Sequence, residues 1–213
     1  LSVAVVLLGT MALSVSRVAA LLTYYGAPAK IYGALPIPSV HAQEPFWPEY
    51  LAREFAAAGA DASINVCVGA EWYRFPSSFH LPSLAYSLRF IDSGFDGALP
   101  MPFDSSKGGT AHTPEGLNDD NEAHPNQFID PRECRFLVEA DFGSSLAGAA
   151  ERPSATPGEW VDVRVEKFVD PLRSPTLTRV LYIPGLSEKR NVYVDYKLKV
   201  LRSPQGRVEE DAA

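Results

Sequence analysis

The sequence lacks the short motifs that mark most soluble enzymes and metal proteins. It contains no nucleophile elbow, no phosphate-binding loop and no Ser/His/Asp order of the kind that supports acyl or phosphoryl transfer. It has only two cysteines, Cys67 and Cys134, and neither belongs to a CxxC or Cys/His pattern of zinc ligands. We therefore expect no metal site and no bound cofactor.

Positive charge is also scarce. The 19 Lys and Arg residues are outnumbered by 26 Asp and Glu, which gives a net charge of −7 and a pI near 5.1. The basic residues form no stripe, so nucleic acid is excluded as the main partner. Hydrophobic residues at 46% and charged residues at 21% are ordinary values for a folded chain, which excludes general disorder.

The first 16 positions carry no charged residue, and Arg17 is the first interruption of this apolar run. A helix of about 20 apolar residues spans the roughly 30 Å hydrocarbon core of a bilayer. A signal peptide is the alternative, but no basic region precedes the run, and the small-residue motif Val40-His41-Ala42 lies too far downstream to be its cleavage site. We predict a transmembrane helix over residues 1–26, truncated at its start.

Arg17 is the main objection to this helix, because a lone Arg at the centre of a bilayer costs about 2.5–3.5 kcal/mol. The cost is smaller near the membrane surface. Tyr24 and Tyr25 follow as aromatic anchors of the kind found at that surface. We therefore expect Arg17 to lie near the interface.

The rest of the chain alternates between strand and helix patterns. Residues 27–62 are predicted to be a membrane-exit linker with a short helix over 48–60, and residues 63–213 to be one compact domain. Strands are expected where β-branched runs or alternating patterns occur, over residues 63–68, 84–91, 135–140, 160–168 and 191–201.

The segment 160–168 places its valines on one face, so it is either a half-buried strand or an extended lead-in to a helix. A short helix is expected over 175–185. Two Gly- and Pro-rich stretches, 92–130 and 143–159, are expected to be irregular loops. Together these elements indicate an α/β (α+β) fold with a small mixed sheet and flanking helices.

Few side chains suggest chemistry. Cys67 and Cys134 lie on or beside predicted strands, and they are either a disulfide between neighbouring strands or two buried thiols. The acidic stretch Asn118–His124 lacks the spacing of a calcium loop and is expected to be solvated. Among the histidines, His41 and His112 are expected at the surface. His80 belongs either to a packed corner of the domain or to a site, and packing is the favoured interpretation.

Glu71, Trp72, Tyr73 and Arg74 follow the predicted strand 63–68 directly. Aromatic faces beside charged hydrogen-bonding groups are typical of sugar-binding sites, but the same residue types also occur in ordinary cores. The residues alone leave both interpretations open.

Several longer motifs carry a family resemblance. The stretches "NVCVGAEWYRFPSSFHLP", "SGFDGALPMPF" and "NDDNEAHPNQFIDPRECRFLVEAD" closely resemble the carboxyl-terminal part of the endoplasmic-reticulum α-1,2-mannosyltransferases that extend the lipid-linked oligosaccharide of N-glycosylation. These enzymes are polytopic glycosyltransferases of the GT-C type (glycosyltransferase family 22). The stretch "LSVSRVAALLTYYGAPAKIY" resembles the family's last transmembrane helix, and "VEKFVDPLRSPTLTRVLYIPGLSEKRNVYVDYKLKV" resembles its terminal segment. Residues 48–61 and 143–158 depart from the family as insertions.

The resemblance implies a C-terminal fragment of an enzyme in the endoplasmic-reticulum membrane, with its C-terminal domain in the lumen. The donor would be dolichyl-phosphate-mannose and the acceptor the dolichol-linked oligosaccharide. The family's catalytic carboxylate lies in a luminal loop upstream of Leu1, so no catalytic residue carries over and the fragment alone would be inactive. A related mannosyltransferase of the glycolipid-anchor pathway and a membrane-tethered, non-catalytic glycan-binding module are the alternatives.

The resemblance also suggests roles for individual residues. Arg17 either contacts the donor phosphate or is a structural Arg that extends towards the interface. Glu71, Trp72, Tyr73 and Arg74 are predicted to face the acceptor. An oxidising lumen would permit a disulfide between Cys67 and Cys134.

Overall fold

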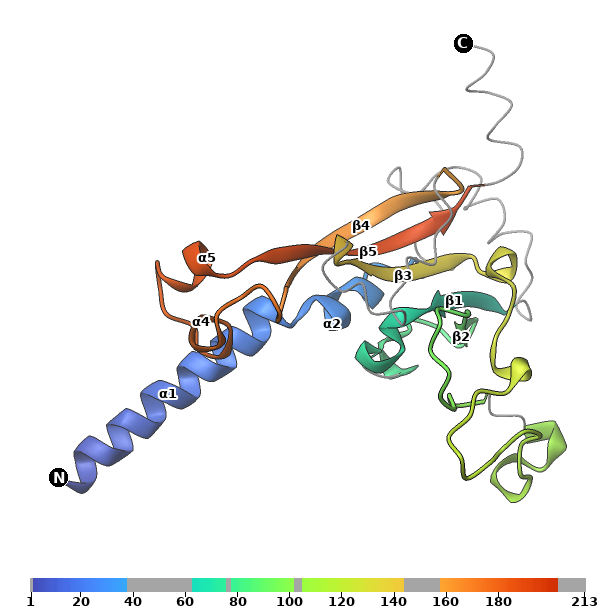
Figure 1. Cartoon of the computed structure of the whole chain (residues 1–213), viewed down its shortest axis with the longest axis horizontal. Helices are drawn as coiled ribbons and strands as arrows, with labels where there is room; N and C mark the ends of the chain where they lie inside the picture. Colours follow the sequence, from blue (N-terminus) through green and yellow to red (C-terminus); the bar gives the residue numbers. More distant parts are fainter. Residues whose placement is uncertain (1, 38–62, 76–77, 102–104, 144–157, 203–213) are drawn as a thin grey trace, which may run out of the picture.

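The computed structural model describes residues 2–37, 63–75, 78–101, 105–143 and 158–202. A long helix, α1 (Val3–Tyr24), projects from a domain built around one β-sheet (Figure 1). The predicted helix over 48–60, the residue His41 and most of the predicted loop 143–159 lie outside the described residues. The two proposed insertions lie mainly there as well.

The sheet has five strands in the order β2-β1-β3-β5-β4. β1 is parallel to β2 and β3, whereas β5 is antiparallel to both β3 and β4. Their bounds are β1 (Ile64–Val68), β2 (Tyr86–Phe90), β3 (Phe136–Asp141), β4 (Trp160–Val169) and β5 (Tyr193–Leu201). The predicted strands and the mixed α+β sheet are therefore confirmed.

The alternation along β5 separates two faces of the sheet. Val194, Tyr196, Leu198 and Val200 are buried, and they join the main core together with residues of β1 and β3. The short helix α2 (Ala27–Tyr32) covers this face and contributes Ile31 and Tyr32, which are both fully buried. The chain therefore enters the core directly after α1, within the stretch that was predicted as a membrane-exit linker, because α2 carries apolar residues that the sheet buries.

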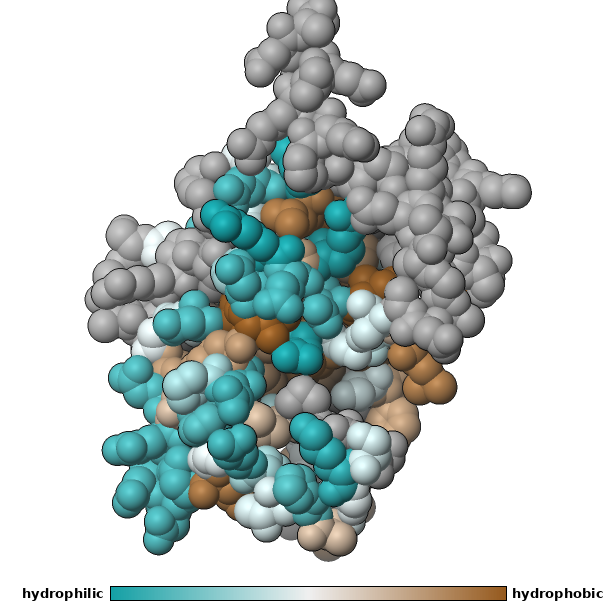
Figure 2. Space-filling model, turned by 90° about the vertical axis from the view of Figure 1, so that its right-hand side faces the viewer, coloured by the Kyte–Doolittle hydropathy of each residue, from teal (hydrophilic) through white to brown (hydrophobic). Residues whose placement is uncertain are grey.

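The opposite face of β5 is charged. Lys197 Nζ lies 3.5 Å from Asp141 Oδ2 and 3.4 Å from Asp162 Oδ2, and Lys199 Nζ lies 3.0 Å from Glu139 Oε2. Partial burial opposes the charge on Lys197, but Asp162 and Asp141 outweigh it and raise its pKa above the usual value. Hydrophilic residues also predominate among those coloured at the end of the domain remote from α1 (Figure 2).

β4 differs from the expected pattern in one respect. The register against β5 shifts between Asp162 and Arg164, which marks an irregularity of the β-bulge type. Val165 is consequently 43% exposed instead of sharing the core face with Val161 and Val163. The sequence pattern placed all three valines on one face because a bulge leaves no mark in a simple alternation.

The helix predicted over 175–185 is wrong in its extent. α4 (Thr176–Val180) ends at Val180, and a separate short helix, α5 (Ser187–Arg190), follows. The chain leaves the helical path because α1 takes its backbone groups: the Tyr182 N–H donates to the Ser16 carbonyl at 3.1 Å, and Ser16 Oγ donates to the Tyr182 carbonyl at 3.0 Å.

The predicted irregular loop at 92–130 is confirmed for residues 92–101 and 105–130, where short 3₁₀ turns occur and Phe128 forms one isolated parallel bridge with Phe90. The acidic stretch Asn118–His124 is held by its own side chains, since Asn118 donates to the carbonyls of Gly116 and Glu122. Its carboxylates are exposed to solvent, as expected, and so is His112.

Candidate functional site

The segment after β1 forms a short 3₁₀ helix, η1 (Ala70–Arg74), whose two charged residues, Glu71 and Arg74, point into the domain. Glu71 is 2% exposed, and its Oε1 lies 2.6 Å from Arg74 Nη1. The Arg74 guanidinium also lies over three aromatic rings, 4.3 Å from the centroid of Tyr73, 4.8 Å from Phe142 and 5.3 Å from Phe168. The Arg74 side chain is 13% exposed, so the ion pair belongs to the domain's interior together with the Phe142 and Phe168 rings, whereas the Tyr73 ring lies at the surface.

Two buried tyrosines lie near this pair. Burial, with the negative charge of Glu71 as a further cause, raises the pKa of Tyr32 and of Tyr196 well above the usual value. Both phenols therefore stay neutral.

The other two residues of the segment face outward to different degrees. The Trp72 ring packs 4.3 Å from that of Phe95, whereas Tyr73 is 49% exposed. Both line a broad groove of about 1010 Å³ with other apolar and polar side chains, among them Phe75, Leu81, Tyr86 and Arg89. The predicted acceptor contact of Glu71–Arg74 stays a prediction, and Trp72 and Tyr73 are its accessible members.

His80 does not pack as expected. It ends the 3₁₀ turn η2 (Ser78–His80), where all three residues are exposed.

Arg17 has a defined partner. Its Nη1 donates to the Val180 carbonyl at 3.0 Å, and the side chain is partly buried between α1 and α4. Val180 is the last residue of α4, so no N–H group of the helix donates to its carbonyl. This contact is structural, and the predicted contact with a donor phosphate stays a prediction.

The structure joins Cys67 and Cys134 in a disulfide, with their Cα atoms 5.7 Å apart. The pairing follows from the topology, since Cys67 lies on β1 and Cys134 comes just before β3, its parallel neighbour. The bond is buried among Ile91 and Leu137, on the side of the sheet opposite the main core.

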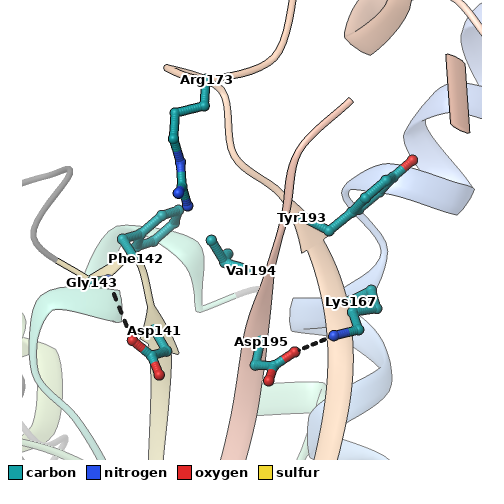
Figure 3. Close-up of a pocket in the computed structure, with 8 residues that line it drawn as sticks. All are labelled: Asp141, Phe142, Gly143, Lys167, Arg173, Tyr193, Val194 and Asp195. Carbon is teal, nitrogen blue, oxygen red and sulfur yellow. Dashed lines mark hydrogen bonds and ion pairs between the residues drawn. The ribbon is translucent and has the colours of Figure 1, made fainter. Parts of the chain in front are cut away.

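A second hollow, which the sequence patterns did not indicate, opens where β3 and β4 end and β5 begins. Its volume is about 400 Å³, and we call it the polar pocket (Figure 3). It is lined by charged, aromatic and small residues: Asp141, Phe142, Gly143, Lys167, Arg173, Tyr193, Val194 and Asp195.

Arg173 is fixed in this pocket by a buried carboxylate. Its Nε donates to Asp170 Oδ2 at 2.6 Å, and Asp170 has no exposed surface. Burial opposes the charge on Asp170, but hydrogen bonds from the Arg173 side chain and from the N–H groups of Leu172 and Arg173 outweigh it and lower its pKa. The end of the guanidinium points towards Phe142 at the pocket (Figure 3).

The remaining charges of the polar pocket balance one another. Lys167 Nζ lies 2.5 Å from Asp195 Oδ1 on the facing strand, and Asp141 Oδ1 accepts from the Gly143 N–H at 3.3 Å. Both charge signs therefore line the same hollow. Among the residues that the structure describes, no three His, Cys, Asp or Glu side chains lie close enough to hold a metal ion.

The sequence held a weak signal for this pocket. Lys167 and Asp195 occupy polar positions in two predicted strands, and Asp170 precedes a proline at a strand end. Their meeting depends on the pairing of β4 with β5, which no local pattern specifies.

The chain is similar in sequence to known α-1,2-mannosyltransferases. It is 40% identical over 151 residues to "Alpha-1,2-mannosyltransferase ALG9" of Homo sapiens, an alignment of 67% of this chain and 24% of that protein. The ALG9 of Arabidopsis thaliana is 32% identical over 182 residues, with 85% of this chain and 28% of that protein covered. The Saccharomyces cerevisiae ALG9 is 30% identical over 175 residues, with 80% and 28% covered.

The chain belongs to this ALG9 mannosyltransferase family. It spans about a quarter of the length of the curated ALG9 proteins that it matches. No family model matches the chain. The expected resemblance to α-1,2-mannosyltransferases is confirmed.

Proposed function

We propose that this chain forms part of an enzyme that transfers mannose in α-1,2 linkage to the lipid-linked oligosaccharide of N-glycosylation. The observation that carries the proposal is the extended similarity to ALG9, at 40% identity over 67% of the chain for the human protein. The named relatives are all α-1,2-mannosyltransferases. None supports the glycolipid-anchor pathway or a non-catalytic module.

We further propose that α1 lies in the endoplasmic-reticulum membrane with the sheet domain in the lumen. α1 is long and apolar enough to cross a membrane, and its side chains from Val3 to Val15 are exposed. At its other end, Tyr24 packs near Tyr182 and Tyr193, which gives the aromatic cluster expected at a membrane surface.

The segment docked beside α1 supports the same placement. Leu177 of α4 is 60% exposed, although α4 lies against α1 through the bond from Arg17 to Val180. An exposed leucine next to a candidate membrane span suits a location at the lipid boundary or against further membrane helices.

The chemistry assigns the domain a supporting role. In an inverting transfer from dolichyl-phosphate-mannose, a carboxylate takes the proton of the acceptor hydroxyl while the bond from C1 to phosphate breaks. Positive charge or amide groups stabilise the leaving phosphate. We take the catalytic carboxylate to lie outside this chain, as expected from the family resemblance, and we propose that the domain caps the site and presents the branched acceptor.

The test is a transfer assay with the complete enzyme, dolichyl-phosphate-mannose and the lipid-linked oligosaccharide acceptor. We expect a mannose-extended acceptor whose new sugar is released by an α-1,2-specific mannosidase. Transfer to a glycolipid-anchor precursor instead, or binding of the glycan without transfer, would contradict the proposal.

A further inference from the structure

We infer that the polar pocket holds sugar residues of the acceptor glycan, remote from the hydroxyl that reacts. This inference rests on the proposed function and adds a binding site to it. The pocket lies at the end of the sheet that is nearest α1, since its residue Tyr193 packs against Tyr24 of that helix at 6.1 Å between ring centroids. A glycan attached to a lipid begins at the membrane surface, so this end of the domain is the one that it reaches first.

The charge pattern of the pocket selects the class of ligand. Lys167 and Arg173 supply donors, and Asp141 and Asp195 supply acceptors, within one hollow of about 400 Å³. A phosphate would meet repulsion from the two carboxylates, and a cation would meet repulsion from the two basic groups. A neutral ligand with many hydroxyl groups can donate to the carboxylates and accept from the basic groups at the same time.

The aromatic residues fit the same ligand. Phe142 and Tyr193 both line the pocket (Figure 3). Phe142 is only 6% exposed, so the apolar surface that a ligand can contact beside the polar groups comes mainly from the partly exposed Tyr193. A volume of this size is in the range of roughly 300–1,000 Å³ that is usual for small-ligand sites.

The pocket is also preorganised. Asp170, which has no exposed surface, holds Arg173 in place. Asp170 also accepts hydrogen bonds from the backbone N–H groups of Leu172 and Arg173, at 2.9 and 3.1 Å. Within the described residues, the Arg173 side chain donates to Asp170 through Nε. The two terminal nitrogens of the guanidinium can therefore donate to a ligand. A donor fixed before binding loses little entropy when the ligand arrives.

The test measures acceptor kinetics in the complete enzyme with donor at saturation. The double variant Lys167→Ala/Asp195→Ala removes an exposed pair, and Arg173→Lys keeps a positive charge for Asp170 while removing the guanidinium fork. We expect each to raise the acceptor KM by about three- to tenfold with little change in kcat, because binding remote from the reaction contributes equally before and during transfer.

The matched control is Arg164→Ala/Glu166→Ala, which removes an ion pair of 2.6 Å on the same strand but outside the pocket. It should leave the acceptor KM unchanged. Thermal unfolding of all variants separates a binding defect from a folding defect. If the double variant unfolds earlier than the control, Asp141→Asn provides a milder change in the same pocket.

A second acceptor makes the outcome decisive. For an acceptor that lacks the remote mannoses, the unmodified enzyme should have the raised KM that the pocket variants have for the full acceptor. The pocket variants should have the same KM as the unmodified enzyme for this shortened acceptor. If the enzyme is active and its pocket variants keep the acceptor KM of the unmodified protein, the inference that the pocket binds the glycan is wrong and the proposed function still holds. An unmodified enzyme that transfers no mannose would overturn both.

Discussion

Arg17 of α1 and Val180 of α4 are joined by a hydrogen bond of 3.0 Å across 163 positions of sequence. Beside this bond, Ser16 and Tyr182 form two more: Ser16 Oγ donates to the Tyr182 carbonyl, and the Tyr182 N–H donates to the Ser16 carbonyl. α1 is therefore joined to the segment between β4 and β5 by polar contacts, in addition to the packing of Ala20 and Tyr24 against Val169. These contacts also account for the early end of α4.

The first prediction concerns this junction. Arg17→Ala leaves the Val180 carbonyl without its donor, and we expect a loss of about 1–3 kcal/mol in stability. Thermal unfolding in detergent measures it. Thr10→Ala is the control, because the Thr10 hydroxyl is exposed and bonds only to carbonyls of its own helix in the described structure.

The same variant tests the predicted contact of Arg17 with the donor phosphate. If the contact exists, Arg17→Ala raises the donor KM or lowers kcat beyond what the loss of folded enzyme explains. Unchanged donor KM and kcat in the folded fraction would leave Arg17 with its structural role alone.

The second prediction concerns the bond between Cys67 and Cys134. It closes a loop with a sequence separation of 67 residues, for which the chain-entropy model gives a stabilisation of about 4 kcal/mol. Mass spectrometry without reduction should find the two cysteine peptides linked. The variant Cys67→Ala/Cys134→Ala should unfold at a lower temperature, and a reducing agent should lower the unfolding temperature of the unmodified protein but not of the variant.

The third prediction separates the residues of η1. Glu71→Gln removes the buried charge that pairs with the partly buried Arg74, and we expect a destabilisation of about 3–5 kcal/mol. Tyr73→Ala alters an exposed ring and should cost no more than about 1 kcal/mol. If the segment faces the acceptor, Tyr73→Ala raises the acceptor KM in fully folded enzyme. A normal acceptor KM for both Tyr73→Ala and Trp72→Ala would assign the segment to packing.

The strands were predictable because their pattern is local. Alternation along 191–201 or a β-branched run at 63–68 reports which side chains a sheet buries, whatever the neighbouring strands are. α4 was not predictable in its extent, because its end depends on hydrogen bonds to Ser16 at the other end of the chain. Local propensity yields to such tertiary contacts.

The candidate site was predictable only in part. The sequence drew attention to Glu71 and Arg74 as charged residues beside aromatic ones, but their direction depends on Phe142 and Phe168, which arrive from β3 and β4. The polar pocket was not predictable from the sequence for the same reason, since Lys167 and Asp195 come together only through the pairing of β4 with β5. Residue type suggested chemistry in both places, and topology decided where that chemistry lies.

The last prediction concerns Asp170 and pH. Its pKa in the folded protein is below the usual value, because the hydrogen bonds from Arg173 and the backbone outweigh the cost of burial. A depressed pKa means that the charged group stabilises the fold fully above the pKa of the unfolded chain, about 3.9, and that this contribution is lost as the pH falls through the folded value.

Asp170→Asn should therefore lower the stability at pH 7 by about 1.5–3 kcal/mol, the range for hydrogen bonds to a charged group. The difference from the unmodified protein should shrink as the pH falls below 3.9, because the unfolded chain then binds a proton first and the native carboxyl is protonated only at lower pH. Thermal unfolding at a series of pH values measures this, with Asp120→Asn in the exposed acidic stretch as the control. A deficit for Asp170→Asn that is the same at pH 7 and at pH 3 would show that the side chain acts through its shape and not through its charge.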